Sequence, residues 1–188
     1  MTAFIKITTA PILSTALALS VASSFGGESC DERLSAVRQT IREDYPSVRQ
    51  ITTQELANWL ADTNRLPPLL LDVRTEDEYR VSHLKNARHI TQNIPISSVT
   101  DELEAGQAVV VYCSVGVRSS DLALRLEQAG LENIYNLDGS IFQWANESRP
   151  LYSGNHATQS VHPYNRKWGR CLKQELHGKA PSPQKGTR

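Results

Sequence analysis

The chain has 188 residues, with 20 lysines and arginines balanced by 20 aspartates and glutamates. This length fits one ordinary domain with extensions, since domains usually run to about 100–150 residues. The balanced charge disfavours nucleic acid and anionic membrane surfaces as partners. The cysteines Cys30, Cys113 and Cys171 are too few and too scattered for a disulfide framework, and none lies at zinc-ligand spacing. We therefore expect no metal and no cofactor, and any chemistry should depend on single thiols.

The N-terminal stretch MTAFIKITTAPILSTALALSVASSFGG resembles an export signal. Lys6 precedes a run of mostly small and apolar residues, and Ala22 offers a small-residue cleavage point. We expect residues 1–25 to be a signal peptide or leader and the protein to be exported to the periplasm. The alternative is a leader on a cytoplasmic protein. We expect no stable membrane span in the mature protein, because a span needs about 20 strongly apolar residues.

Residues 26–49 are predicted to form a helical N-terminal arm. Leu34, Val37 and Ile41 follow one another at three- and four-residue spacing, which is typical of one face of a helix. The helix should end before Pro46, because the residue before a proline disfavours helical geometry. Residues 50–150 are then predicted to form one α/β domain.

The domain is predicted to begin with a helix over QELANWLAD, residues 54–62. Thr52 and Glu55 have the spacing of a capping box, in which a hydroxyl and a carboxylate satisfy free backbone N–H groups. The residues expected to be buried on this helix are Leu56, Trp59 and Leu60.

Strands and helices then alternate four times. LLLDV, residues 69–73, is an unbroken apolar run, which is typical of a strand buried on both faces of a parallel sheet. A second capping box, Thr75 to Glu78, should begin a helix over EDEYRVSHL. The remaining predicted segments are the strand ARHI, the helix ISSVTDELEAG, the strand AVVVY, the helix SSDLALRLEQAG, the strand NIYNL and the helix SIFQWANE. This alternation predicts an α/β sheet with right-handed crossovers.

The pattern ends after Pro150. Residues 151–172 contain aromatic side chains without periodicity, so we predict an irregular C-terminal extension packed on the domain, with Tyr164 and Trp168 as its anchors. Residues 173–188 are predicted to be a disordered tail. Cys30 and Cys171 flank the domain and could pair in an oxidising compartment, the alternative being two unpaired thiols.

Cys113 directly follows the strand AVVVY, at the end of a parallel strand where ligands bind in α/β sheets. The loop CSVGVR leads into Ser119 and Ser120, which suit a helix start, so backbone N–H groups and the helix dipole can converge on the sulfur. Such a site lowers a thiol pKa, and Arg118 would add to the effect. Gly116 allows the loop to curl with its N–H groups inward. The alternative is a buried cysteine that acts as a small hydrophobe.

Three segments, LLLDVRTEDEYRVSHLKNAR, VVVYCSVGVRSS and NIYNLDGSIFQWANE, resemble the rhodanese-like family of sulfurtransferases in order and spacing. The resemblance covers about residues 50–148 and includes the loop pattern C-x-x-G-x-R-S. It implies a doubly wound, mostly parallel sheet flanked by helices on both faces, and a cysteine that carries a persulfide. It also places the active-site loop on Cys113 to Arg118. The flanks, residues 31–50 and VHPYNRKWG, look like additions found in one bacterial subgroup.

The expected activity is that of a thiosulfate sulfurtransferase-type enzyme. A Cys113 thiolate attacks the outer sulfur of a small donor such as thiosulfate, sulfite leaves, and a thiol, cyanide or protein acceptor takes the sulfur from the Cys113 persulfide. Neither a general acid nor a dedicated base is required, because the leaving group is a stable anion and the loop holds the thiolate ionised. The residues expected to bind the substrate and the persulfide are Ser114, Val115, Gly116, Val117, Arg118 and Ser119.

Other readings of the loop stay open. Ser114 and Val115 stand where some family members carry cationic residues, which questions thiosulfate as the physiological donor. A phosphatase or arsenate reductase is disfavoured. Similar families with those activities have five residues between the cysteine and the arginine of the loop, whereas four residues separate Cys113 from Arg118. A non-enzymatic sulfur carrier or partner-binding module is the main alternative. Asp72 and Arg74 should support the site, either as an ion pair that fixes the loop or by touching the substrate.

Overall fold

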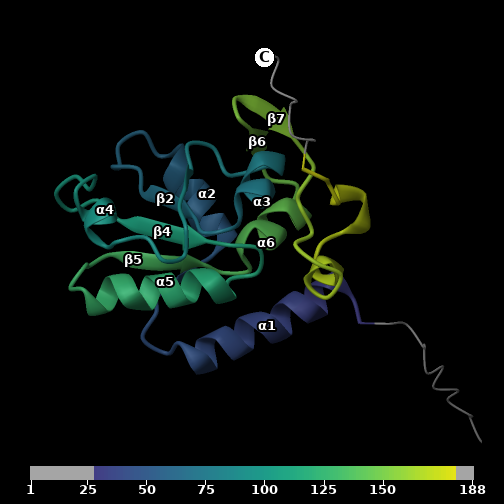
Figure 1. The fold of residues 1–188 in the computed structure, drawn as a ribbon, viewed down its shortest axis with the longest axis horizontal. Coiled ribbons are helices and arrows are strands. Elements are labelled where there is room, and N and C mark those ends of the chain that lie inside the picture. Colours follow the sequence, from purple (N-terminus) through teal and green to yellow (C-terminus); the bar gives the residue numbers. More distant parts are fainter. Residues whose placement is uncertain (1–27, 181–188) are drawn as a thin grey trace, which may run out of the picture.

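A computed structural model describes residues 28–180, and its core is a five-stranded sheet in which all neighbouring strands are parallel (Figure 1). The strands are β1 (Gln50–Ile51), β2 (Leu69–Asp72), β3 (Arg88–His89), β4 (Val109–Tyr112) and β5 (Ile134–Leu137). Their order across the sheet is β1-β5-β4-β2-β3. β4 is central and buried along its whole length, as its unbroken apolar run predicts.

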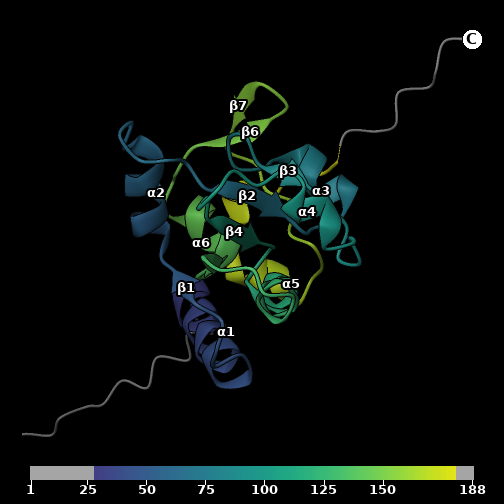
Figure 2. The same ribbon diagram turned by 90° about the vertical axis from the view of Figure 1, so that its left-hand side faces the viewer.

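Helices surround the sheet, as the view turned by 90° makes clear (Figure 2). They are α1 (Cys30–Asp44), α2 (Thr53–Ala61), α3 (Glu76–Val81), α4 (Ser97–Thr100), α5 (Val117–Gln128) and α6 (Ser140–Asn146). Alternate residues of β4 serve two cores, because successive side chains of a strand point to opposite faces. Val110 packs in one core with residues of α1, α2 and α6, whereas Val109 and Val111 pack in the other with residues of α4 and α5. The predicted α/β fold with helices on both faces is confirmed.

Capping boxes begin three of the helices. The two predicted pairs, Thr52 with Glu55 and Thr75 with Glu78, are present at the starts of α2 and α3. A third pair, Ser29 with Glu32, begins α1 and was not predicted. Because each cap satisfies backbone N–H groups that the helix leaves unpaired, each is worth about 1 kcal/mol of helix stability.

Some predicted boundaries and contacts were wrong. Leu60, expected to be buried, is 39% exposed, because α2 turns this side chain away from the sheet. α5 begins at Val117 rather than near Ser119, since Gly116 serves as its N-cap in a left-handed conformation. α3 is only six residues long and ends at Val81, because the chain becomes extended at Ser82 and the next residue, His83, pairs with the C-terminal extension.

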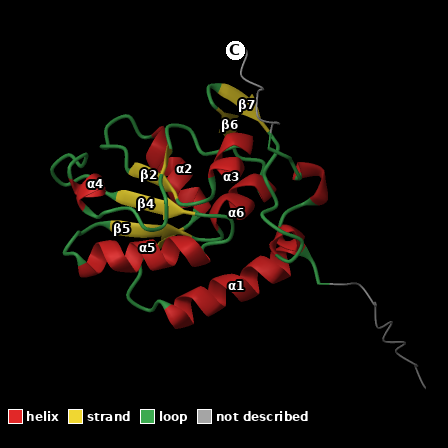
Figure 3. Cartoon of the chain, viewed as in Figure 1, coloured by secondary structure: helices red, strands yellow, loops and turns green. Residues whose placement is uncertain are grey.

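The C-terminal extension is more regular than predicted (Figure 3). It contains the antiparallel hairpin of β6 (Leu151–Ser153) and β7 (His156–Thr158), then the short 3-10 helices η1 (Trp168–Cys171) and η2 (Gln174–Leu176). The predicted disordered tail is wrong for residues 173–180. Leu176 O accepts a hydrogen bond from Val161 N–H (2.7 Å), and Gly178 N–H donates to Val161 O (2.8 Å), so these residues pair with the extension.

The arm and the extension meet beside the domain, where the beginning of α1 packs against η1 (Figure 1). Cys30 and Cys171 are both free thiols in this region, and burial together with the neighbouring Cys30 raises the pKa of Cys171. Their pairing stays a prediction. The predicted leader, residues 1–25, lies outside the described residues, and so does the end of the predicted tail, residues 181–188. Within residues 28–180, no helix has the length and apolar character to span a membrane.

Candidate active site

Cys113 lies at the carboxyl end of the central strand β4 and is 1% exposed. Its backbone N–H donates a hydrogen bond to Ser140 Oγ (3.1 Å), and its carbonyl accepts one from the Ile141 N–H (3.2 Å). These contacts fix the cysteine to the first turn of α6. The position of its thiol is therefore set by the sheet and by two helices.

Gly116 shapes the loop around the sulfur. It adopts a φ of +110° at the N-cap of α5, and its N–H lies 3.2 Å from Cys113 Sγ. A Cβ atom at this position would lie 2.9 Å from Ile41 Cδ1 on the arm, so only glycine fits without a shift. The Gly116 carbonyl accepts the Ser120 N–H (3.0 Å) and closes the first turn of the helix. The helix therefore begins with its N–H groups beside the thiol.

The surroundings of Cys113 favour the thiolate. Burial raises the pKa of this thiol, but the positive charge of Arg118, the backbone and hydroxyl groups of Ser119 and the Gly116 N–H lower it, and the lowering prevails. A thiolate, unlike a thiol, is a strong nucleophile. Cys113 can therefore act as a nucleophile at a lower pH than an ordinary thiol.

Arg118 is held by a carboxylate that the sequence did not mark as part of the site. Its two terminal nitrogens lie 3.0 and 2.9 Å from the oxygens of Glu78, and Ser114 Oγ donates to the same carboxylate at 2.7 Å. Glu78 is fully buried, which raises its pKa, yet Arg118, Thr75 and Ser114 together lower this pKa to about 2. Glu78 therefore stays ionised and keeps Arg118 beside the thiolate.

A small cavity of about 100 Å³ opens over the cysteine. The residues that line it are Cys113, Ser114, Val115, Val117, Arg118, Tyr164 and Trp168. Tyr164 lies with its ring centre 4.5 Å from the Arg118 guanidinium carbon. The sequence assigned Tyr164 and Trp168 an anchoring role, and the structure places both at the cavity itself. Of the predicted loop, Gly116 and Ser119 lie beside the sulfur rather than on the cavity surface.

Asp72 and Arg74 form a fully buried ion pair at the end of β2, with Arg74 Nη2 2.6 Å from Asp72 Oδ2. Arg74 also donates to the Ser82 carbonyl, while its Nη1 has no hydrogen-bond partner within residues 28–180. Neither residue lines the cavity over Cys113. The pair stabilises the connection between β2 and α3, and so the element that carries Glu78.

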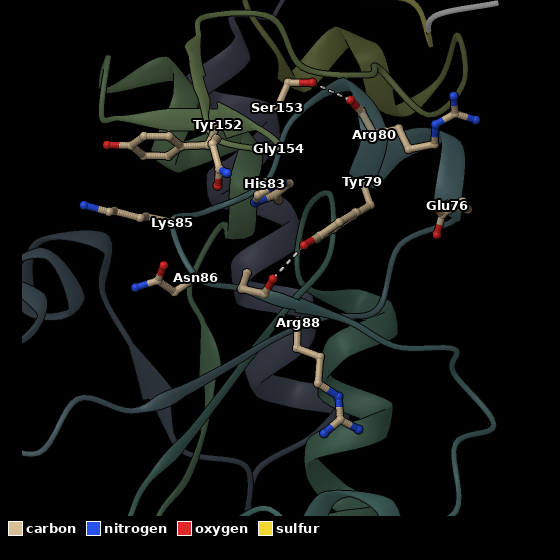
Figure 4. Close-up of a pocket in the computed structure, with 12 residues that line it drawn as sticks. Glu76, Tyr79, Arg80, His83, Lys85, Asn86, Arg88, Tyr152, Ser153 and Gly154 are labelled. Atoms are coloured by element: carbon tan, nitrogen blue, oxygen red, sulfur yellow. Dashed lines mark hydrogen bonds between the residues drawn. The ribbon is translucent and has the colours of Figure 1, made fainter. Parts of the chain in front are cut away.

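A larger cavity, of about 660 Å³, lies beyond α3 (Figure 4). Tyr79 faces this cavity, stacks on His83 and donates to the Ala87 carbonyl (2.7 Å), whereas the adjacent Glu78 contacts the cysteine loop. The cationic side chains of Arg80 and Lys85 extend from its rim (Figure 4). Cys113 does not line this larger cavity, so we do not assign the reaction to it. Within residues 28–180, no cluster of three or more His, Cys, Asp or Glu side chains could hold a metal ion.

The chain matches one family of protein domains over half of its length. The model described as "Rhodanese-like domain" matches residues 52–147. The chain belongs to the rhodanese-like domain family. The match begins just before α2 and ends just after α6, so it contains the cysteine loop and Glu78 but neither the α1 arm nor the extension.

Several similar proteins are named for sulfur transfer. A sulfurtransferase from Allochromatium vinosum is 33% identical over 105 residues, covering 55% of this chain and 94% of that protein. The thiosulfate sulfurtransferase GlpE from Vibrio cholerae is 32% identical over 82 residues, covering 44% of this chain and 76% of GlpE. The probable adenylyltransferase/sulfurtransferase MoeZ from Mycobacterium tuberculosis is 32% identical over 101 residues, covering 53% of this chain, and this chain spans only 25% of the length of MoeZ.

Solved structures share the fold. The BH2092 protein from Bacillus halodurans superimposes with a TM-score of 0.55 at 19% identity, covering 71% of this chain and 94% of that chain. The rhodanese-like domain of the Alr3790 protein from Anabaena sp gives a TM-score of 0.50 at 22% identity, covering 56% of this chain and 80% of that chain. At these identities the likeness supports the rhodanese-like fold alone.

Proposed function

We propose that this rhodanese-like protein is a sulfurtransferase that carries sulfane sulfur as a persulfide on Cys113. The observation that supports this function most directly is the Gly116 N–H, which lies 3.2 Å from Cys113 Sγ at the beginning of α5. A helix N-terminus beside a buried sulfur stabilises a thiolate, and it would stabilise a persulfide anion in the same way.

The reaction has two transfers. The Cys113 thiolate attacks the outer sulfur of a donor such as thiosulfate, the donor S–S bond breaks, and sulfite leaves with the electron pair. The persulfide then gives its outer sulfur to a thiol or to cyanide, and the thiolate is restored. Because each leaving group is a stable anion, the absence of a histidine beside Cys113 among the described residues fits this chemistry.

Intact-mass measurement tests the proposal. Purified protein and a Cys113→Ser control are incubated with thiosulfate, mercaptopyruvate or a persulfide, and then with cyanide. We expect the wild type alone to gain the mass of one sulfur atom and to lose it to cyanide with formation of thiocyanate. No mass gain from any of the three donors would contradict the proposal and favour a partner-binding module.

Turnover separates an enzyme from a sulfur carrier. An enzyme forms thiocyanate or a product persulfide repeatedly with small acceptors, whereas a carrier takes up one sulfur per chain and releases it only to a protein partner. The phosphatase alternative predicts hydrolysis of an aryl phosphate, which we do not expect from the Cys113–Arg118 spacing.

Export to the periplasm is a further proposal, and an intact Met1 on protein from its own cells would rule out cleavage near Ala22.

A further inference from the structure

The part of the extension over Cys113 is fixed at both ends. Before it, Val161 is fully buried and pairs with residues near η2. After it, Cys171 and Leu172 are buried in the core, and Asn146 Nδ2 donates to the Cys171 carbonyl (2.9 Å). The intervening residues 162–170, which we call the strap, include Tyr164 and Trp168. These two side chains therefore line the cavity from a segment that is attached to the domain on both sides.

The cavity offers little positive charge to an anion. The one cation among its lining residues, Arg118, is paired through both terminal nitrogens with ionised Glu78, and the Tyr164 ring covers it. Lys167 Nζ lies 4.9 Å from the centre of the Trp168 ring, but it does not line the cavity. With the Cys113 thiolate included, Glu78, Arg118 and Cys113 together carry one negative charge. A dianion such as thiosulfate would enter this space without a free cation to compensate its desolvation.

The remaining wall is apolar and narrow. Val115, Val117 and Trp168 supply side chains without charge, and the volume is about 100 Å³. Apolar and aromatic walls bind slender apolar groups well. The surface of the cavity therefore matches a donor whose sulfur is attached to a short alkyl group.

We propose that Tyr164 and Trp168 determine the donor, so that Cys113 takes sulfur from a small alkyl hydropersulfide in preference to thiosulfate. This inference rests on the proposed sulfurtransferase function and names the substrate class of the same site. The Cys113 thiolate attacks the outer sulfur of R–S–SH, a new S–S bond forms, and the donor S–S bond breaks. The leaving thiolate R–S⁻ takes the proton from the new persulfide, which gives Cys113–S–S⁻ and R–SH without any external oxidant or reductant.

Single-turnover loading tests the preference with ethyl hydropersulfide and thiosulfate as donors. The rate of mass gain on Cys113 is divided, for each donor, by its rate with a small thiol in solution, which removes the intrinsic reactivity of the donor. We expect the normalised rate to be roughly tenfold or more in favour of ethyl hydropersulfide, the scale of discrimination that apolar pockets achieve. Equal normalised rates would overturn the inference but leave the sulfurtransferase intact. No loading from either donor, nor from mercaptopyruvate, would instead overturn the proposed function.

Two sets of variants identify the residues responsible. Tyr164→Ala and Trp168→Ala should lose most of the preference, whereas Tyr152→Ala, which removes a ring of the same extension outside this cavity, should keep it. Glu78→Gln, which removes the negative charge behind Arg118, should raise loading from thiosulfate relative to ethyl hydropersulfide. An unchanged preference in both strap variants would show that the wall does not select the donor, even if Glu78→Gln proves too unstable to measure.

Discussion

The thiol of Cys113 combines two opposing influences, because burial favours its neutral form and Arg118 with nearby N–H groups favours the thiolate. Since the net effect lowers the pKa, the thiolate should persist at a pH where an ordinary thiol, with a pKa of about 8.5, is protonated. We expect the rate at which iodoacetamide alkylates Cys113 to fall with pH through a lower midpoint than that of an unfolded cysteine peptide measured under the same conditions.

The charge of Arg118 should account for part of this shift. Arg118→Met should move the midpoint to higher pH, and Arg118→Lys, which retains a positive charge, should move it less. Alkylation rates measured from pH 5 to pH 10 on protein with Cys30 and Cys171 replaced by serine would report Cys113 alone. Identical midpoints in the wild type and Arg118→Met would contradict the role given to this charge.

A second prediction concerns the contribution of Glu78 to the stability of the fold. Its pKa is lowered from 4.5 to about 2, chiefly by Arg118 against the opposing effect of burial. A lowered carboxyl pKa contributes stability that is present above the unfolded value and is lost as pH falls through the folded value. The wild type should therefore lose on the order of 2–3 kcal/mol of unfolding free energy between about pH 5 and pH 2 from this group.

Urea unfolding across that pH range measures the contribution. The Glu78→Gln protein should be less stable than the wild type at pH 7, and the difference should shrink as the solution becomes more acidic. Glu104→Gln, a change at an exposed carboxylate, serves as the control and should show no such convergence. A constant difference between wild type and Glu78→Gln would argue against ionised Glu78 as the source.

At the scale of elements, the start of α5 depends on a close approach to the arm. Gly116→Ala combines a strained left-handed backbone with a Cβ atom 2.9 Å from Ile41 Cδ1, so we expect a loss of about 1–3 kcal/mol and slower loading of Cys113. Gly130→Ala is the matched control, because Gly130 also has a positive φ (+87°) but no atom within 4 Å of its Cβ position. Thermal unfolding should show a smaller loss for Gly130→Ala; equal losses would mean that the contact with α1 contributes nothing.

On the scale of the whole molecule, docking of the extension should control access to Cys113. Asn146 on α6 donates to the Cys171 carbonyl and accepts from the Lys173 N–H (3.0 Å), so Asn146→Ala removes two of its attachments. We expect a stability loss of about 1–3 kcal/mol and faster modification of Cys113 by N-ethylmaleimide. Asn58→Ala, on the exposed face of α2, should change neither quantity. Unchanged reactivity in Asn146→Ala would show that the strap is held by other contacts.

The sequence predicted the contacts between residues that are close along the chain and missed those between residues that are far apart along it. The Cys113–Arg118 loop could be found because a strand, a glycine and a helix start adjoin along the chain. Glu78 was recognised as a capping residue, but its contact with Arg118 spans 40 positions and has no local pattern. Tyr164 lies in a segment without periodicity, so no sequence pattern indicated that it lines the cavity. Only the structure shows that position.

Two ion pairs attach the arm to the domain, because Oδ2 of the buried Asp138 lies 2.6 Å from a nitrogen of Arg38 and 2.6 Å from a nitrogen of Arg42, both of which are partly exposed. In the sheet, the arm leads into β1, whose neighbour is β5. During synthesis on the ribosome, β1 is therefore made long before β5, the strand with which it pairs. The arm is likewise made before Asp138, to which it is attached. The aromatic wall emerges later still. The nascent chain thus passes through a stage in which Cys113 has been synthesised but the strap that lines its cavity has not.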